Sequence, residues 1–108
     1  MENLSACEEQ VMVVIWASNE APDLQTTVKA VNARFGHAWK PQTVSTFVVR
    51  LTKKGYLRME RKGRYYFYFS EVSLEEYRKE QMRYMVKQLF NGDKDDAIKC
   101  IKECSVKE

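Results

Sequence analysis

The stretch from residue 39 to residue 70, WKPQTVSTFVVRLTKKGYLRMERKGRYYFYFS, is the most informative part of this sequence. Pro41 suits the first turn of a helix, and the apolar residues after it recur at helical spacing until Gly55 follows the last turn. Two β-prone runs come next, at 56–60 and 65–70, and the glycine between them can adopt the positive φ of a hairpin turn. The stretch therefore predicts an amphipathic helix that leads into a basic-tipped β-hairpin.

Two further helices are predicted before this stretch. Ser5 and Glu8 have the spacing of a capping box, and an apolar stripe follows over about residues 5–18. The residues of this stripe are Val11, Met12, Ile15 and Trp16. Asp23 offers an N-cap for a second helix, which Gly36 ends. The apolar face of that helix consists of Leu24, Val28, Val31 and Phe35. Three helices followed by a hairpin, in this order, indicate a winged helix-turn-helix.

The sequence after the hairpin predicts two more helices. A second capping-box pattern begins at Ser73 and starts a long helix to about Phe90, and a shorter one follows over about residues 93–104. The expected fold class is thus mostly α with a small β-hairpin, a winged helix-turn-helix followed by C-terminal dimerisation helices. The expected domains are a winged-helix DNA-binding domain at 1–71 and a helical dimerisation segment at 72–108.

Charge is distributed unevenly along these 108 residues, which provide material for about one domain. Residues 1–23 carry five acids and no Lys or Arg, residues 24–70 carry ten bases and one acid, and residues 71–108 carry eight bases and nine acids. The formal net charge of +3 therefore conceals a middle segment of +9. A concentrated basic region of this kind favours a polyanionic partner such as double-stranded DNA.

The helix after Pro41 is the expected DNA-reading element. When Val44, Phe47, Val48 and Leu51 face the core, a polar stripe faces outward. The base-contacting residues expected on this stripe are Gln42, Thr43, Thr46 and Arg50. Gln and Arg can each make two hydrogen bonds to one base edge, and Thr offers a hydroxyl and a methyl group. The alternative is an ordinary solvated helix face, but Thr is a poor helix former for that purpose.

Basic residues around this helix and on the hairpin are expected to contact the DNA backbone: Lys40, Lys53, Arg61, Lys62 and Arg64. The connection 61–64 could instead protect an edge strand from aggregation. The neighbouring aromatic run, residues 65–69, could stack on bases, but in a two-faced strand about half of the rings must face the core. Core packing is therefore the expected role of two or three of them.

The long helix carries more apolar surface than one small domain can cover. Its expected dimer-interface residues are Leu74, Tyr77, Met82, Met85, Val86, Leu89 and Phe90. The short final helix offers mainly Ala97, Ile98 and Ile101 to cover them, so a twofold homodimer is favoured over a helix that folds back on its own domain.

Three cysteines and no export signal indicate a reduced, cytoplasmic protein, and no apolar run is long enough for a membrane span. No cofactor and no metal site are expected. Cys100 and Cys104 are weak candidates for a soft-metal site, because the i, i+4 spacing places both thiols on one helix face. Cys7 and His37 are expected to be packing and loop residues, respectively.

Four segments together resemble the penicillinase-repressor family of bacterial winged-helix regulators, which includes the β-lactamase and methicillin-resistance repressors and copper-responsive relatives. They are EEQVMVVIWAS (8–18), WKPQTVSTFVVRLTKKGYL (39–57), GRYYFYF (63–69) and VSLEEYRKEQ (72–81). The resemblance implies homodimeric repressors on palindromic operators, with base contacts at the positions that the helical wheel selects. Antibiotic-responsive members are inactivated by proteolysis at an Asn-Phe bond, where this chain has Cys100-Ile101, and copper-responsive members carry a Cys-x-Cys cluster that is absent here.

The function expected from the sequence is therefore a homodimeric, sequence-specific DNA-binding repressor. A winged helix used for protein–protein assembly is the alternative, although such a module would not need the basic stripe. An enzyme is not expected, because one histidine and no clustered carboxylates provide no nucleophile–base pair.

Overall fold

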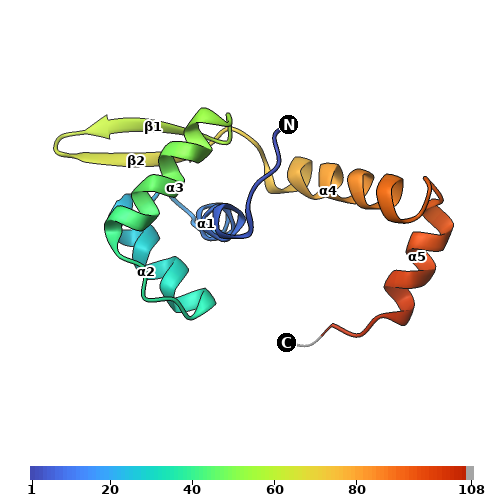
Figure 1. Cartoon of the computed structure of the whole chain (residues 1–108). Helices are drawn as coiled ribbons and strands as arrows, with labels where there is room; N and C mark the ends of the chain where they lie inside the picture. Colours follow the sequence, from blue (N-terminus) through green and yellow to red (C-terminus); the bar gives the residue numbers. More distant parts are fainter. Residues whose placement is uncertain (107–108) are drawn as a thin grey trace. The chain divides into compact units, whose positions relative to one another are not determined.

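The computed structural model describes residues 1–106, which form five helices and one antiparallel hairpin (Figure 1). In chain order the elements are α1 (Ala6–Ala17), α2 (Leu24–Phe35), α3 (Pro41–Lys53), β1 (Leu57–Lys62), β2 (Tyr65–Ser70), α4 (Leu74–Leu89) and α5 (Lys94–Glu103). The predicted fold class, a mostly helical winged helix-turn-helix with further C-terminal helices, is confirmed. The chain divides into two compact units after Ser73. Residues 107 and 108 of the expected segment 72–108 lie outside the described residues.

Helix α1 begins with the predicted capping box. The Ser5 hydroxyl accepts a hydrogen bond from the Glu8 N–H at 3.2 Å, and the Glu8 carboxylate accepts one from the Ser5 N–H at 2.8 Å. Glu8 is only 2% exposed and also accepts a hydrogen bond from Lys54 Nζ at 2.7 Å. Burial raises the pKa of Glu8, but Lys54 and Ser5 together outweigh burial and hold that pKa below its usual value. The Glu8–Lys54 ion pair thus connects α1 to the end of α3.

We expect Glu8→Gln to lower the free energy of unfolding by about 1–3 kcal/mol near neutral pH, because it weakens a buried charge-assisted hydrogen bond. The folded-state pKa of Glu8 is depressed, so its contribution is present above the unfolded-state pKa and is lost as the pH falls through the folded-state value. Urea unfolding of both proteins should therefore show a difference that shrinks below about pH 4.5. Glu20→Gln, at an exposed carboxylate, is the control. A Glu8→Gln difference that is independent of pH would contradict this account.

Helices α2 and α3 form the helix-turn-helix, and their predicted ends are confirmed. The Asp23 carboxylate accepts a hydrogen bond from the Thr26 N–H at 2.9 Å, and this bond lowers the Asp23 pKa. Gly36 ends α2 with φ of +70°, a left-handed conformation that favours glycine. Pro41 is the first residue of α3, where its missing N–H has no helical partner to lose.

The hairpin turn is shorter than the sequence suggested. Strand β1 continues through Lys62, which pairs with Tyr65, so only Gly63 and Arg64 form the turn. Gly63 has φ of +65° and Arg64 does not have a positive φ, which is the pattern of a type II′ turn. The predicted connection at 61–64 is therefore wrong at its start, because a two-residue turn allows the strand ladder to include Arg61 and Lys62.

The core of the first unit lies where α1 packs against α2, α3 and β2. Its fully or nearly fully buried apolar residues are Val11, Met12, Val14, Ile15, Val31, Val44, Val48, Leu51, Tyr56, Leu57 and Tyr68. Several residues expected in the core are only half-buried: Trp16, Leu24, Val28, Phe35 and Phe47. They lie at the edges of their apolar faces, where a small three-helix body leaves one side of each ring or chain uncovered. Of the aromatic run 65–69, where two or three core rings were expected, only Tyr68 is buried, and Phe67 and Phe69 are half-buried.

The second unit consists of α4 and α5. Asn91 and Gly92 follow α4 with φ of +51° and +81°, and the Gly92 N–H donates to the Val86 carbonyl at 2.9 Å. Asp93 then caps α5 by accepting a hydrogen bond from the Asp96 N–H at 3.1 Å. Over residues 1–106, no helix has both the length and the apolar character that a bilayer crossing requires.

Candidate nucleic-acid interface

Helix α3 presents a polar stripe on the face opposite its buried residues. Val44, Val48 and Leu51 are buried, and the four expected base-contacting residues are all exposed: Gln42, Thr43, Thr46 and Arg50. The expected backbone-contacting residues Lys40 and Lys53, at the two ends of the helix, are exposed as well. The fold therefore leaves this stripe exposed, so that α3 could enter the major groove of DNA.

The turn between α2 and α3 is held by a reciprocal pair of hydrogen bonds. The Asn32 side-chain amide donates to the Trp39 carbonyl, and the Trp39 N–H donates to the Asn32 side-chain carbonyl, both at 3.0 Å. Both groups of the Trp39 backbone are thus satisfied within α2. The pair fixes the chain that leads directly into α3.

An aromatic stack continues from this turn to Arg50. The ring centres of His37 and Trp39 lie 4.0 Å apart with an angle of 8° between the ring planes, and the ring centres of Trp39 and Phe47 lie 5.2 Å apart. The Arg50 guanidinium lies 5.9 Å from the centre of the Phe47 ring. Phe47 was expected to face the core, but it serves as a half-buried support beneath Arg50. A cation–π contact of this kind restricts the guanidinium before any ligand binds.

Thr46 has part of its hydrogen-bonding capacity occupied by its own helix. Its hydroxyl donates to the Gln42 carbonyl at 3.0 Å. The oxygen lone pairs and the methyl group remain exposed, so Thr46 can accept from an amino group of a base or contact a thymine methyl. It cannot donate to a base unless it releases this bond.

The hairpin carries the basic residues Arg61, Lys62 and Arg64, all of which are exposed. Arg61 Nε donates to the Gly63 carbonyl at 2.9 Å, and its guanidinium lies 5.9 Å from the Tyr66 ring. Lys62 Nζ lies 5.8 Å from the Phe67 ring. Within residues 1–106 none of the three has a carboxylate partner, so their charges are available to an anion.

Two bases of the +9 segment are already neutralised. Lys54 pairs with Glu8, as described above, and Arg58 pairs with Glu60 and, at 2.7 Å, with Glu71. Of the eight other bases in this segment, six lie at α3 or on the hairpin tip, namely Lys40, Arg50, Lys53, Arg61, Lys62 and Arg64, and two lie on α2. Charge counting by segment did not predict this division, because two of the three partner carboxylates, Glu8 and Glu71, lie outside the basic segment.

The apolar stripe on α4 is largely uncovered within its own unit. Met82, Met85 and Leu89 are 49%, 43% and 74% exposed. A groove of about 310 Å³ between α4 and α5 has an apolar lining that includes Val86 and Phe90, which are themselves half-buried. Leu74 is also half-buried, whereas Tyr77 is only 5% exposed and has little surface left for a partner. These seven residues remain the predicted dimer interface.

The two C-terminal thiols are exposed on α5 and at its end. The Cys104 thiol donates to the Ile101 carbonyl at 3.3 Å, and Cys7 is half-buried in the first unit. In the described part of the chain no group of three or more His, Cys, Asp or Glu side chains is placed to hold a metal ion.

We expect operator affinity to be unchanged by Cu(I) or Zn(II), since two thiols alone make an incomplete site. The measurement is DNA affinity with and without each metal, for the unaltered protein and for Cys100→Ser/Cys104→Ser. A metal-induced loss of tenfold or more, about 1.4 kcal/mol, that the double variant abolishes would overturn this expectation.

A helix-turn-helix with an exposed polar second helix and a basic β-hairpin defines a winged-helix protein of the nucleic-acid-binding class. The chain belongs to the penicillinase repressor family, whose model matches residues 4–106.

Two characterised relatives support this assignment. The chain is 27% identical to the penicillinase repressor of Bacillus licheniformis over 89 residues, which is 82% of this chain and 67% of that protein. It is 22% identical to the methicillin resistance regulatory protein MecI of Mammaliicoccus sciuri over 89 residues, or 82% of this chain and 70% of that protein.

Two solved structures resemble the fold. The DNA-binding domain of the repressor BlaI matches with a TM-score of 0.59 and 29% identity, over 71% of this chain and 94% of that domain. The monomeric form of Bacillus licheniformis BlaI, in complex with the blaP half-operator, matches with a TM-score of 0.57 and 29% identity, over 70% of this chain and 89% of that chain.

Proposed function

We propose that the chain is a DNA-binding transcriptional repressor that acts in the cytoplasm as a homodimer on a palindromic operator. The observation that carries the proposal is the exposed stripe of α3, with Arg50 held over Phe47, beside a hairpin tip whose three basic residues have no carboxylate partner within residues 1–106. The likeness to BlaI, a repressor with a structure on half-operator DNA, supports the same role.

In this proposal the first unit reads DNA. Gln42, Thr43, Thr46 and Arg50 contact base edges in the major groove, and Lys40, Lys53, Arg61, Lys62 and Arg64 contact phosphates. The segment from residue 72 onward joins two copies, so that two α3 helices meet the two half-sites of a palindrome.

A catalytic role is not proposed. The single histidine of the chain, His37, stacks on Trp39 and has its Nε2 within 2.7 Å of the Gln10 side-chain oxygen. This ring supports the helix-turn-helix turn, and its geometry gives no reason to assign it a proton-transfer role.

The test is a titration of a palindromic duplex, chosen by in vitro selection from a random pool, at about 50 mM and 200 mM salt. A repressor of this kind should bind the selected duplex more tightly than a scrambled one and should lose affinity steeply as salt rises, because each phosphate contact releases counterions. An assembly module that does not use DNA would show neither sequence preference nor salt dependence, and that result would overturn the proposal.

A further inference from the structure

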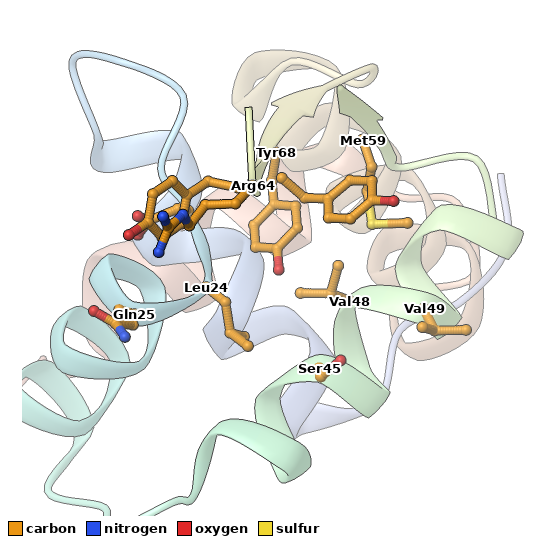
Figure 2. A pocket seen from close by; sticks show the side chains of 11 residues that line it. Leu24, Gln25, Ser45, Val48, Val49, Met59, Arg64 and Tyr68 are labelled. Carbon is orange, nitrogen blue, oxygen red and sulfur yellow. The ribbon is translucent and has the colours of Figure 1, made fainter. Parts of the chain in front are cut away.

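A cleft of about 410 Å³ opens between the hairpin, α3 and the start of α2 (Figure 2). Its floor is apolar and includes Leu24, Val48 and Met59. Figure 2 shows the Tyr68 ring between the hairpin and α3, with its hydroxyl directed toward the space between Leu24 and Val48. The cleft thus lies beside the exposed stripe of α3 and extends to the hairpin tip.

The rim of this cleft is polar and unoccupied by internal bonds. It comprises the side chains of Gln25, Ser45, Arg64, Tyr65 and Tyr66. Tyr65 and Tyr66 are each 49% exposed, although large aromatic rings are usually covered when the fold can cover them. Across residues 1–106 none of these five side chains makes a hydrogen bond or an ion pair, although the Tyr66 ring lies 5.9 Å from the Arg61 guanidinium. They offer one cation, one amide and three hydroxyl groups to a ligand.

The remaining ionisable groups of the cleft are compatible with an anion at the rim. Asp23 is committed to the Thr26 N–H, and its charge lies at the N-terminus of α2, where the helix dipole is positive. Burial and the Asp23 charge raise the pKa of Tyr68, so its phenol stays protonated. Arg64 is therefore the cationic side chain in the lining of the cleft that an anion can pair with.

We propose that this cleft seats one stretch of the DNA sugar–phosphate backbone. A phosphodiester lies at the rim, where Arg64 supplies the positive charge and Gln25, Ser45, Tyr65 and Tyr66 are the available neutral donors, while a deoxyribose rests on the apolar floor. The inference rests on the proposed DNA binding, because a duplex that contacts both α3 and the hairpin must pass over the space between them. Such contacts orient the protein on the duplex without reading its sequence.

The test combines protein variants with chemically altered DNA. Tyr66→Phe removes one neutral donor, so it should weaken binding about three- to tenfold on the selected and the scrambled duplex alike and leave the salt dependence unchanged. Arg64→Ala should also weaken both, and it should lower the slope of log K against log salt by about 1. Tyr84→Phe on α4, an exposed tyrosine in the second unit, is the matched control and should have no effect.

A scan with single methylphosphonates, which remove the phosphate charge one position at a time, then locates the contact. At one position of each half-site, the modified duplex should bind the unaltered protein more weakly. At that position the affinities of Tyr66→Phe and Arg64→Ala should equal the affinity of the unaltered protein. Two results would overturn the proposal. In the first, each substitution lowers affinity at every modified position. In the second, the effects of the two substitutions disappear at widely separated phosphates.

The outcomes also separate this inference from the repressor function. If Tyr66→Phe and Arg64→Ala bind DNA normally while Arg50→Ala does not, the cleft has another role and the repressor function stands. If those two variants keep full DNA affinity but lose binding of 1-naphthoate, a small aromatic anion, the cleft is a small-ligand site and the proposal fails. If the unaltered protein shows no preference for any duplex, the proposed function itself fails.

Discussion

A protein that carries Met85→Glu and Leu89→Glu is expected to be monomeric and to bind a full palindromic operator about a hundredfold more weakly or worse. Both side chains are exposed on α4, beside the apolar groove of the second unit. A charge there would have to lose its water on association, which opposes the apolar contact. Without the partner, the second half-site contact no longer occurs at a high effective concentration.

The experiment needs a variant with the same change in charge elsewhere on the helix. Lys87→Gln/Gln88→Glu also lowers the net charge by two units, and both residues are exposed and outside the predicted dimer interface. Sedimentation should show a monomer only for the Met85/Leu89 variant, and a single half-site should bind both variants alike. If the unaltered protein already sediments as a monomer at micromolar concentration, the homodimer proposal is wrong.

Arg50→Ala is expected to cost about 1–3 kcal/mol on the selected operator and to relax the preference at one base pair. The guanidinium is exposed and supported by the Phe47 ring, so it is already restricted to one side of α3. This exposed cation–π contact is worth only about 0.5–1 kcal/mol, so most of the expected loss comes from the bidentate contact that the guanidinium makes to a guanine. The measurement is affinity for the selected duplex and for all single-base variants of one half-site.

Lys62→Ala provides the contrast for this reading role. Its ammonium is exposed near the hairpin tip, so it should weaken binding to every duplex about equally and lower the salt slope by about 1. If Arg50→Ala kept the base preference of the unaltered protein, Arg50 would be a phosphate contact and would leave the set of base-reading residues.

Local signals in the sequence predicted the helix ends well. The capping pairs at Ser5 and Asp23 and the left-handed Gly36 depend on residues within four positions of one another. Their chemistry therefore does not require knowledge of the tertiary fold. The hairpin turn was less predictable, because the point where pairing stops depends on both strands and on the conformation of Gly63.

Contacts between distant residues could not be predicted from composition. The middle segment has a formal charge of +9, but Lys54 and Arg58 form ion pairs with Glu8 and Glu71 from the flanking acidic stretches. Periodicity placed Phe47 inward, whereas its position at the edge of the apolar face allows it to pack against Trp39. The cleft likewise unites residues from α2, α3 and the hairpin that no short motif connects.

The paired hydrogen bonds between Asn32 and Trp39, together with the aromatic stack that follows them, have a thermodynamic consequence. They join α2, the turn and α3 into one rigid body, so the helix-turn-helix already has its DNA-bound conformation before binding. It can therefore gain little binding free energy by changing shape on a poor site. Adjustment must then come mainly from the duplex. Operators that share every contacted base should still differ in affinity according to how readily their uncontacted steps bend and twist.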